Sequence, residues 1–184
     1  MTNRITHDQK LAWFRSDFQP RFEEWVVAPA RRMVEAGDDM GVGMPAFIWL
    51  TCSIDWLAGF WHGERTKGKV RQVYIGFIDR YFPTGRYDAE NLYESLRNGL
   101  VHMYTIQHKK YALTHRHPET HLHPNHEGYI LLNLEDFFED CQFAKNAYFQ
   151  EVETDKSLLN KAFKRIKRDG FLGLVPVNLL VQEE

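Results

Sequence analysis

The chain has 184 residues and a formal net charge of −2 at pH 7, which suits one domain and gives no general support for nonspecific nucleic-acid binding. Hydrophobic residues make up 43% of it, enough for a core that needs no structural metal, and the two cysteines, Cys52 and Cys141, are too few for a disulfide framework. The polar N-terminus lacks a signal-peptide core, and polar residues interrupt the most apolar stretch at 44–61, so we expect a soluble, cytoplasmic protein without a membrane span.

The first half of the chain predicts three helices. Apolar residues at steps of three and four begin at Leu11, and because Pro20 and Pro29 lie inside this pattern we expect one kinked helix or two abutting helices. A second helix, from about Pro45 to Trp61, is apolar on nearly all sides, which predicts a central position. A third is predicted over residues 70–81.

The second half predicts three more helices and an insertion. Asp88 is a candidate N-cap for a fourth helix, whose apolar row includes Leu96. Short strands are expected at 104–114 and 128–132, around a histidine-rich tip. Asn133 and Asp136 resemble a capping box for a fifth helix, and the sixth spans 156–169. The expected fold over residues 1–184 is therefore a mainly α single domain of five to six helices, with a small hairpin-like insertion at about 104–132.

The most chemically specific feature is the run Arg97-Asn98-Gly99-Leu100-Val101-His102 at the end of the fourth helix. Asn98 and His102 are four residues apart and share one helix face, whereas Arg97 lies about 140° from His102 but has a long side chain. Arginine offers a fixed fork of donors for a phosphate, and histidine can move a proton near neutral pH. The run therefore suits phosphate chemistry, with the alternative that it is an ordinary polar helix end.

This run, continued by Met103 and Tyr104, resembles the signature of HEPN domains (higher eukaryotes and prokaryotes nucleotide-binding). The resemblance implies a metal-independent endoribonuclease in which His102 is the general acid or base, Arg97 stabilises the charged transition state and Asn98 orients nearby groups. It also implies a homodimer, with RNA as substrate, a role as a toxin or defence effector and a possible antitoxin partner. Other members of the superfamily are non-catalytic and bind nucleotides or proteins, so a binding module is the first alternative.

A histidine-rich loop is the basis of a second alternative. Five of the nine histidines fall between residues 115 and 126. The pairs His115 with His117 and His121 with His123 would each lie on one side of an extended segment, and together they could bind zinc or another transition metal. The competing interpretation is a solvated polar loop, or histidines that frame the approach to His102.

Basic residues cluster in two places that could contact a phosphate backbone. One lies on the outer face of the sixth helix and includes Lys161, Lys164, Arg165 and Arg168; the other covers residues 65–71. A solvated helix face is the commoner explanation of such clusters. Trp13 and Tyr93 lie off the apolar rows and are candidates for a protein interface.

Overall fold

The computed structural model describes residues 5–37, 41–106 and 110–170, and within them the chain is mainly helical. Its helical segments include π-helical stretches, labelled η1, η2 and η4, that continue directly into α-helices. The predicted bundle of five to six helices with a small insertion is confirmed. The elements are α1 (His7–Trp13), η1 (Phe14–Phe18), α2 (Gln19–Phe22), η2 (Glu23–Val27), α3 (Ala28–Ala36), α4 (Gly43–His62), α5 (Val70–Tyr81), α6 (Ala89–Asn91), η4 (Leu92–Asn98), α7 (Gly99–Met103), β1 (Tyr111–Thr114), η6 (Pro118–Thr120), β2 (Ile130–Asn133), α8 (Leu134–Thr154) and α9 (Lys156–Asp169).

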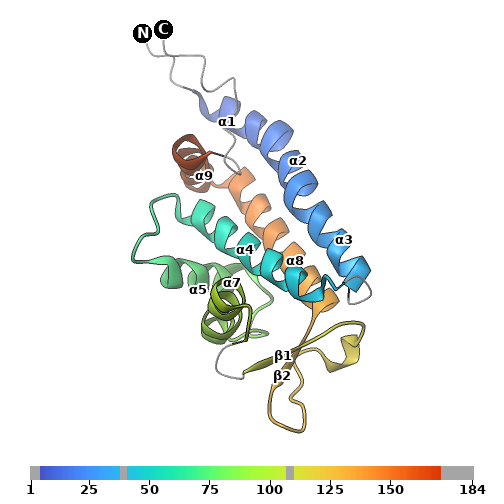
Figure 1. The fold of residues 1–184 in the computed structure, drawn as a ribbon. Helices are drawn as coiled ribbons and strands as arrows, with labels where there is room; N and C mark the ends of the chain where they lie inside the picture. The colour runs from blue at the N-terminus through green and yellow to red at the C-terminus, as the bar shows by residue number, and fades with distance from the viewer. Residues whose placement is uncertain (1–4, 38–40, 107–109, 171–184) are drawn as a thin grey trace.

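The first five segments, α1 to α3, form one continuous rod rather than two helices (Figure 1). Proline has no N–H to donate, so it interrupts the ordinary hydrogen-bond ladder. Here a wider turn precedes each proline: Gln19 N–H bonds to the carbonyl five residues back just before Pro20, and Ala28 N–H does the same just before Pro29. The two π-helical turns therefore let the rod continue through both prolines.

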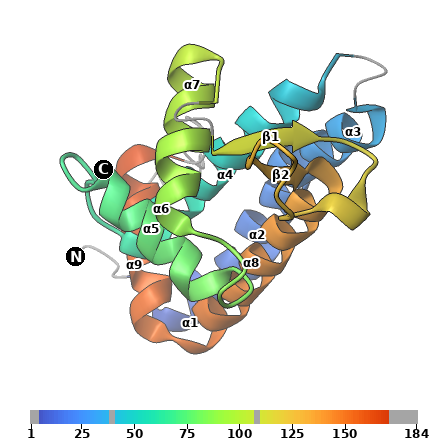
Figure 2. The same ribbon diagram turned by 90° about the horizontal axis from the view of Figure 1, so that it is seen from below.

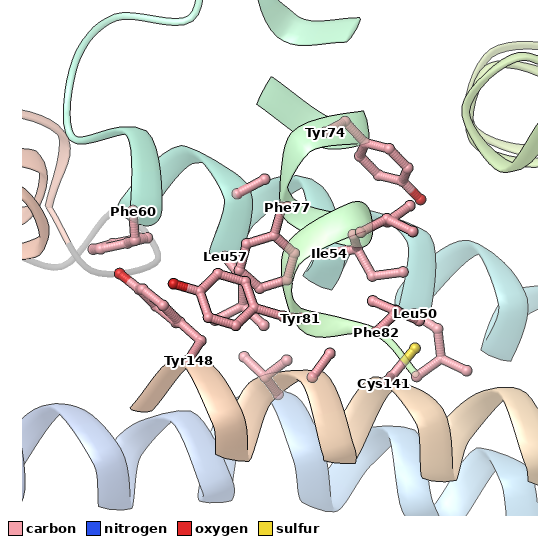
Figure 3. Packing of buried hydrophobic residues seen from close by; sticks show 14 of the residues in the cluster. Leu50, Ile54, Leu57, Phe60, Tyr74, Phe77, Tyr81, Phe82, Cys141 and Tyr148 are labelled. Atoms are coloured by element: carbon pink, nitrogen blue, oxygen red, sulfur yellow. The ribbon is translucent and has the colours of Figure 1, made fainter. Parts of the chain in front are cut away.

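Helix α4 occupies the centre of the bundle, as its apolar sequence predicts. It contacts α3, α5, α8 and α9, and buried residues lie along its whole length. Figure 3 shows the core beside it, where Leu57 of α4 and Phe77 and Tyr81 of α5 face Tyr148 of α8. The rings of Phe77 and Tyr81 lie 5.7 and 5.4 Å from that of Tyr148, within the range of favourable edge-to-face packing.

The helix that carries the candidate site is built from α6, η4 and α7. It begins where predicted, because the side chain of Asp88 accepts a hydrogen bond of 3.0 Å from Asn91 N–H. Its apolar row, Leu92, Leu96 and Leu100, is fully buried. Burial of one face therefore fixes which residues of this helix point outward.

The insertion between α7 and α8 differs from the predicted hairpin. Strands β1 and β2 pair in parallel, with Tyr111 opposite Ile130 and Thr114 opposite Asn133. A hairpin-like turn lies within the insertion, where the segment before β2 folds back and Pro124 forms an antiparallel bridge with Ile130 of β2. Residues 115–129 separate the two strands, and such a connection is long enough to reverse the chain twice.

Two smaller predictions are wrong. Asn133 stands at the N-cap of α8 but does not form a capping box: its Oδ1 accepts from His117 N–H at 3.1 Å, and its Nδ2 donates to Asp136 at 2.7 Å. Trp13 and Tyr93 are not surface candidates for an interface, since the ring of Trp13 packs against Phe163 and only 8% of Tyr93 is exposed. In the described part of the chain, no helix has the length and apolarity needed to cross a bilayer.

Candidate functional site

The Arg97–His102 run spans the junction of η4 and α7. Figure 2 shows α7 projecting from the body of the bundle, and His102, in its last turn, is exposed. The helix stops soon afterwards because Tyr104 adopts a left-handed conformation with φ of 54°, which is uncommon for a bulky residue. The run therefore ends at the surface while its apolar row stays in the core.

Arg97 brings the three predicted residues together. Its Nη1 lies 3.1 Å from Asn98 Oδ1 and 3.0 Å from His102 Nε2. The wide turn of η4 ends at Asn98, immediately before the helix segment that carries His102. Only 16% of the Arg97 side chain is exposed, so the guanidinium is held in a fixed position rather than swinging in solvent.

The contact between Arg97 and His102 defines the proton arrangement on the imidazole. Arginine has donors and no acceptor, so the Nε2 of His102 must be the acceptor in this contact. The neutral ring then carries its proton on Nδ1, and the one lone pair of Nε2 accepts from Arg97. His102 can therefore act as a base at Nε2 once the guanidinium turns from this nitrogen to a phosphate.

Asp55 of α4 belongs to the candidate site, although the sequence did not single it out. Its Oδ2 accepts a hydrogen bond of 2.6 Å from Arg97 Nη2. Burial of the guanidinium opposes its charge, but the hydrogen bond and the charge of Asp55 outweigh burial and raise the pKa of Arg97. The signal was present in the sequence, because a carboxylate inside the most apolar helix needs a cationic partner.

Aromatic and polar neighbours complete the surroundings of Arg97. The guanidinium carbon lies 5.7 Å from the centre of the Tyr93 ring, within cation–π range. Asn98 Nδ2 lies 3.4 Å from Glu94, and Glu94 in turn pairs with Arg71 at 3.1 Å. These contacts hold both Arg97 and Asn98 from the side of the helix that faces α5.

The four basic residues predicted on α9 lie beside α4 and the α4–α5 connection. Lys164 pairs with Glu64 at 3.3 Å, and Arg168 with Asp169 at 2.7 Å. Arg165 donates to the Glu64 carbonyl at 2.8 Å and pairs with Asp169 at 2.7 Å. Lys161 packs its aliphatic stem over Gly63.

Arg165 is the member of this group that approaches the candidate site. Burial lowers its pKa, while the charges of Asp169 and Asp55 act in the opposite direction. Asp55 thus interacts electrostatically with cations on both η4 and α9.

The structure does not gather the four predicted metal ligands into one place. His115 lies against Gly37 and pairs with Glu135 at 3.0 Å, while His117 faces Glu119 at 3.4 Å and His123 is exposed. Across residues 5–37, 41–106 and 110–170, no group of three or more His, Cys, Asp or Glu side chains is placed to hold a metal ion.

His121 instead belongs to a buried hydrogen-bonded chain. Asn133 N–H donates to its Nδ1 at 3.1 Å, so the proton of the neutral ring is on Nε2, which faces Tyr87 Oη at 3.0 Å. Tyr87 then donates to Asp140 of α8 at 2.6 Å, and Asp140 pairs with Arg86. The side chains of His121 and Asp140 are 3% and 8% exposed. Metal binding at His115 or His121 would therefore have to break these contacts.

Comparison with known proteins adds no relative: no protein-family model, curated protein or solved structure matches the chain. The resemblance at Arg97–His102 thus stays a prediction. The contacts of Arg97, Asn98, His102 and Asp55 are therefore the observations that bear on function.

Proposed function

We propose that this protein is a metal-independent endoribonuclease whose active site is formed by Arg97, Asn98 and His102. The observation that carries the proposal is the position of one guanidinium, which contacts Asp55, Asn98 and His102 Nε2 at an exposed helix end. A cation beside an imidazole is the combination that phosphate-ester cleavage needs, and a phosphate that replaces His102 as a partner of Arg97 would free the Nε2 lone pair. The Asp55 carboxylate is paired with Arg97. We therefore assign the proposed catalysis to protein side chains.

The proposed reaction is an internal transfer at phosphorus. Arg97 Nη1 turns from His102 to the phosphate, the 2′-oxygen of a ribose attacks that phosphate, and the freed His102 Nε2 takes the hydroxyl proton. The bond from phosphorus to the 5′-oxygen of the next nucleotide breaks, leaving a 2′,3′-cyclic phosphate and a 5′-hydroxyl. Arg97 stabilises the extra negative charge of the transition state, and Asn98 orients Arg97 through its Oδ1.

The departing 5′-oxygen needs a proton. A single His102 cannot serve as both base and acid in the same step. A homodimer that places two copies of His102 around one phosphate would supply both groups. We therefore include a homodimer in the proposal, acting in the cytoplasm as a toxin or defence effector under the control of a possible antitoxin protein.

The test is cleavage of mixed cellular RNA by the purified protein in EDTA, compared with Arg97→Ala and His102→Ala. Loss of the base should lower the rate by about a hundredfold or more, and loss of the cation by a similar factor. The matched control is His126→Ala, because the His126 side chain is 88% exposed and lies in the insertion. This control should cleave like the parent protein.

Two results would count against the proposal. If the parent protein leaves RNA intact, or if all variants cleave equally, the Arg97 network has a structural role. The second candidate function, a non-catalytic binding module, is favoured by one observation: the Arg97 guanidinium already has protein partners on both terminal nitrogens. That function predicts a stable complex with a nucleotide or protein and no cleavage.

A further inference from the structure

Three cations follow one face of α4 at successive helical turns. Lys161 lies over Gly63, Arg165 lies over Gly59, and Arg97 is bound to Asp55. These α4 positions are four residues apart, so each step along the helix is about 6 Å. We call Lys161, Arg165 and Arg97 the α4 cation row. It ends at the candidate active site.

Gly59 lets the Arg165 guanidinium lie directly against α4, and Gly63 lets the aliphatic stem of Lys161 do the same. A Cβ built on Gly59 would be 3.3 Å from Arg165 Nη2, and one on Gly63 would be 2.6 Å from the Lys161 Cβ. Helix α9 runs antiparallel to α4 in this register, since the higher-numbered cation lies over the lower-numbered glycine. The absence of side chains at Gly59 and Gly63 thus lets α9 pack closely on α4, with Arg165 and Lys161 beside the positions that follow Asp55 at steps of four residues.

The charge balance around the row is positive. Lys164 and Arg168 lie on the same helix, and Lys69 approaches from the start of α5. The carboxylates among these cations are Glu64, Asp169 and Asp55, and Asp169 is shared by two arginines. The positive charge also acts on His62, at the end of α4. Burial lowers the pKa of His62, and the charges of Lys69, Lys161 and Arg165 lower it further, whereas the charge of Glu64 raises it.

We infer that the α4 cation row binds the phosphate backbone of single-stranded RNA and guides it to His102. Cations set at successive turns along a helix can neutralise successive phosphates without reading base sequence. This inference rests on the proposed ribonuclease function and names how its substrate is held. It assigns Lys161 and Arg165 to substrate binding and gives Gly59 and Gly63 the role of admitting them.

The test is the affinity of a fluorescein-labelled, mixed-sequence single-stranded RNA, measured by fluorescence anisotropy in a His102→Ala background that cannot cleave it. Lys161→Glu should weaken binding about tenfold and reduce the slope of log affinity against log salt by about one. Lys161 is exposed, and circular dichroism would verify that the variant folds. The matched control is Arg32→Glu, the same reversal of charge at an exposed position of α3.

The outcomes separate the inference from the proposed function. Equal weakening by Lys161→Glu and Arg32→Glu would show a bulk charge effect and overturn the inference, even if the parent protein cleaves RNA. If Lys161→Glu weakens RNA binding and Arg32→Glu does not, the α4 cation row binds RNA. This conclusion holds even if the parent protein does not cleave RNA. If no RNA binds at low salt, both proposals fail.

Discussion

At the scale of single residues, Asp55 is the group that holds Arg97 in place. We predict that Asp55→Asn lowers RNA cleavage about tenfold, because a weaker partner lets the guanidinium move away from His102. The free energy of unfolding should fall by only about 1 kcal/mol, since the Asp55 side chain is 31% exposed and solvent screens the pair. Cleavage assays and urea denaturation would measure the two effects separately.

A conservative change provides the control for this prediction. Asp55→Glu keeps the negative charge, so it should recover part of the cleavage lost in Asp55→Asn. A variant that loses stability and activity in proportion would instead indicate a purely structural ion pair.

A second prediction at this scale concerns the buried chain from His121 through Tyr87 to Asp140. Tyr87→Phe removes the hydroxyl that joins the other two side chains, and it leaves two buried polar groups without that partner. We expect the free energy of unfolding to fall by about 1–3 kcal/mol, measured by urea denaturation. Tyr129→Phe, in the insertion that carries His121, is the control, and an equal loss in both variants would contradict the prediction.

The sequence run 97–102 could be selected in advance because histidine, arginine and asparagine at a helix end carry their chemistry with them. Asp55 could not be paired with Arg97 in advance, since 42 residues separate the two and their contact depends on how α4 packs against η4. The partners of His115 and His121 could not be predicted for the same reason. Local pattern identifies groups able to act, and packing decides which of them meet.

At the scale of secondary structure elements, the end of α4 offers a test of how closely α9 approaches. Gly63 and Gly68 both have left-handed backbones, with φ of 78° and 77°. An alanine at Gly68 would meet nothing within 4 Å, whereas one at Gly63 would collide with Lys161. We predict that Gly68→Ala costs about 1 kcal/mol of stability from backbone strain alone and that Gly63→Ala costs more, as measured by urea denaturation.

Equal costs at the two glycines would mean that Lys161 moves aside freely, and the close contact of α9 with α4 would then not be a stability determinant. The difference between the two variants is the informative quantity, because the strain from positive φ is common to both.

Elements with strong local signals were the ones that sequence could define. The Asp88 cap, the apolar faces of α4 and α9 and the glycine that follows α9 all act within a few residues. The π-helical turns before Pro20 and Pro29 and the parallel pairing of β1 with β2 were not predicted. The turns have a local cause in the two prolines, but the sequence pattern left a kink and a break equally open. The parallel pairing depends on contacts between residues distant in the chain.

At the scale of the whole molecule, buried tyrosines predict sensitivity to alkali. Burial raises the pKa of five tyrosines above the ordinary value of about 10, in the case of Tyr111 to about 12. The folded chain therefore keeps protons that the unfolded chain releases, so stability is unaffected below pH 10 and falls as pH rises above it, by about 1.4 kcal/mol per pH unit for each tyrosine. The five are Tyr74, Tyr81, Tyr87, Tyr111 and Tyr148.

Tyrosinate absorbance and circular dichroism, followed together through an alkaline titration, would test this. We expect most of the ionisation to coincide with cooperative loss of helix. Gradual ionisation of these tyrosines with the helix signal unchanged would show that their hydroxyls reach solvent in the folded state.

The rod formed by α1 to α3 also has a consequence for how the protein is made. Its aromatic residues first meet α4, where Phe18 and Phe22 stack on Trp56. Other partners lie far along the chain: Arg15 bonds to Glu153, 138 residues away, and Trp13 packs on Phe163 of α9. At a synthesis rate of about 5–20 residues per second, Glu153 is made roughly 7–28 s after Arg15. Arg165 arrives later still, so the nascent chain completes its proposed RNA-binding ridge only when α9 has been made.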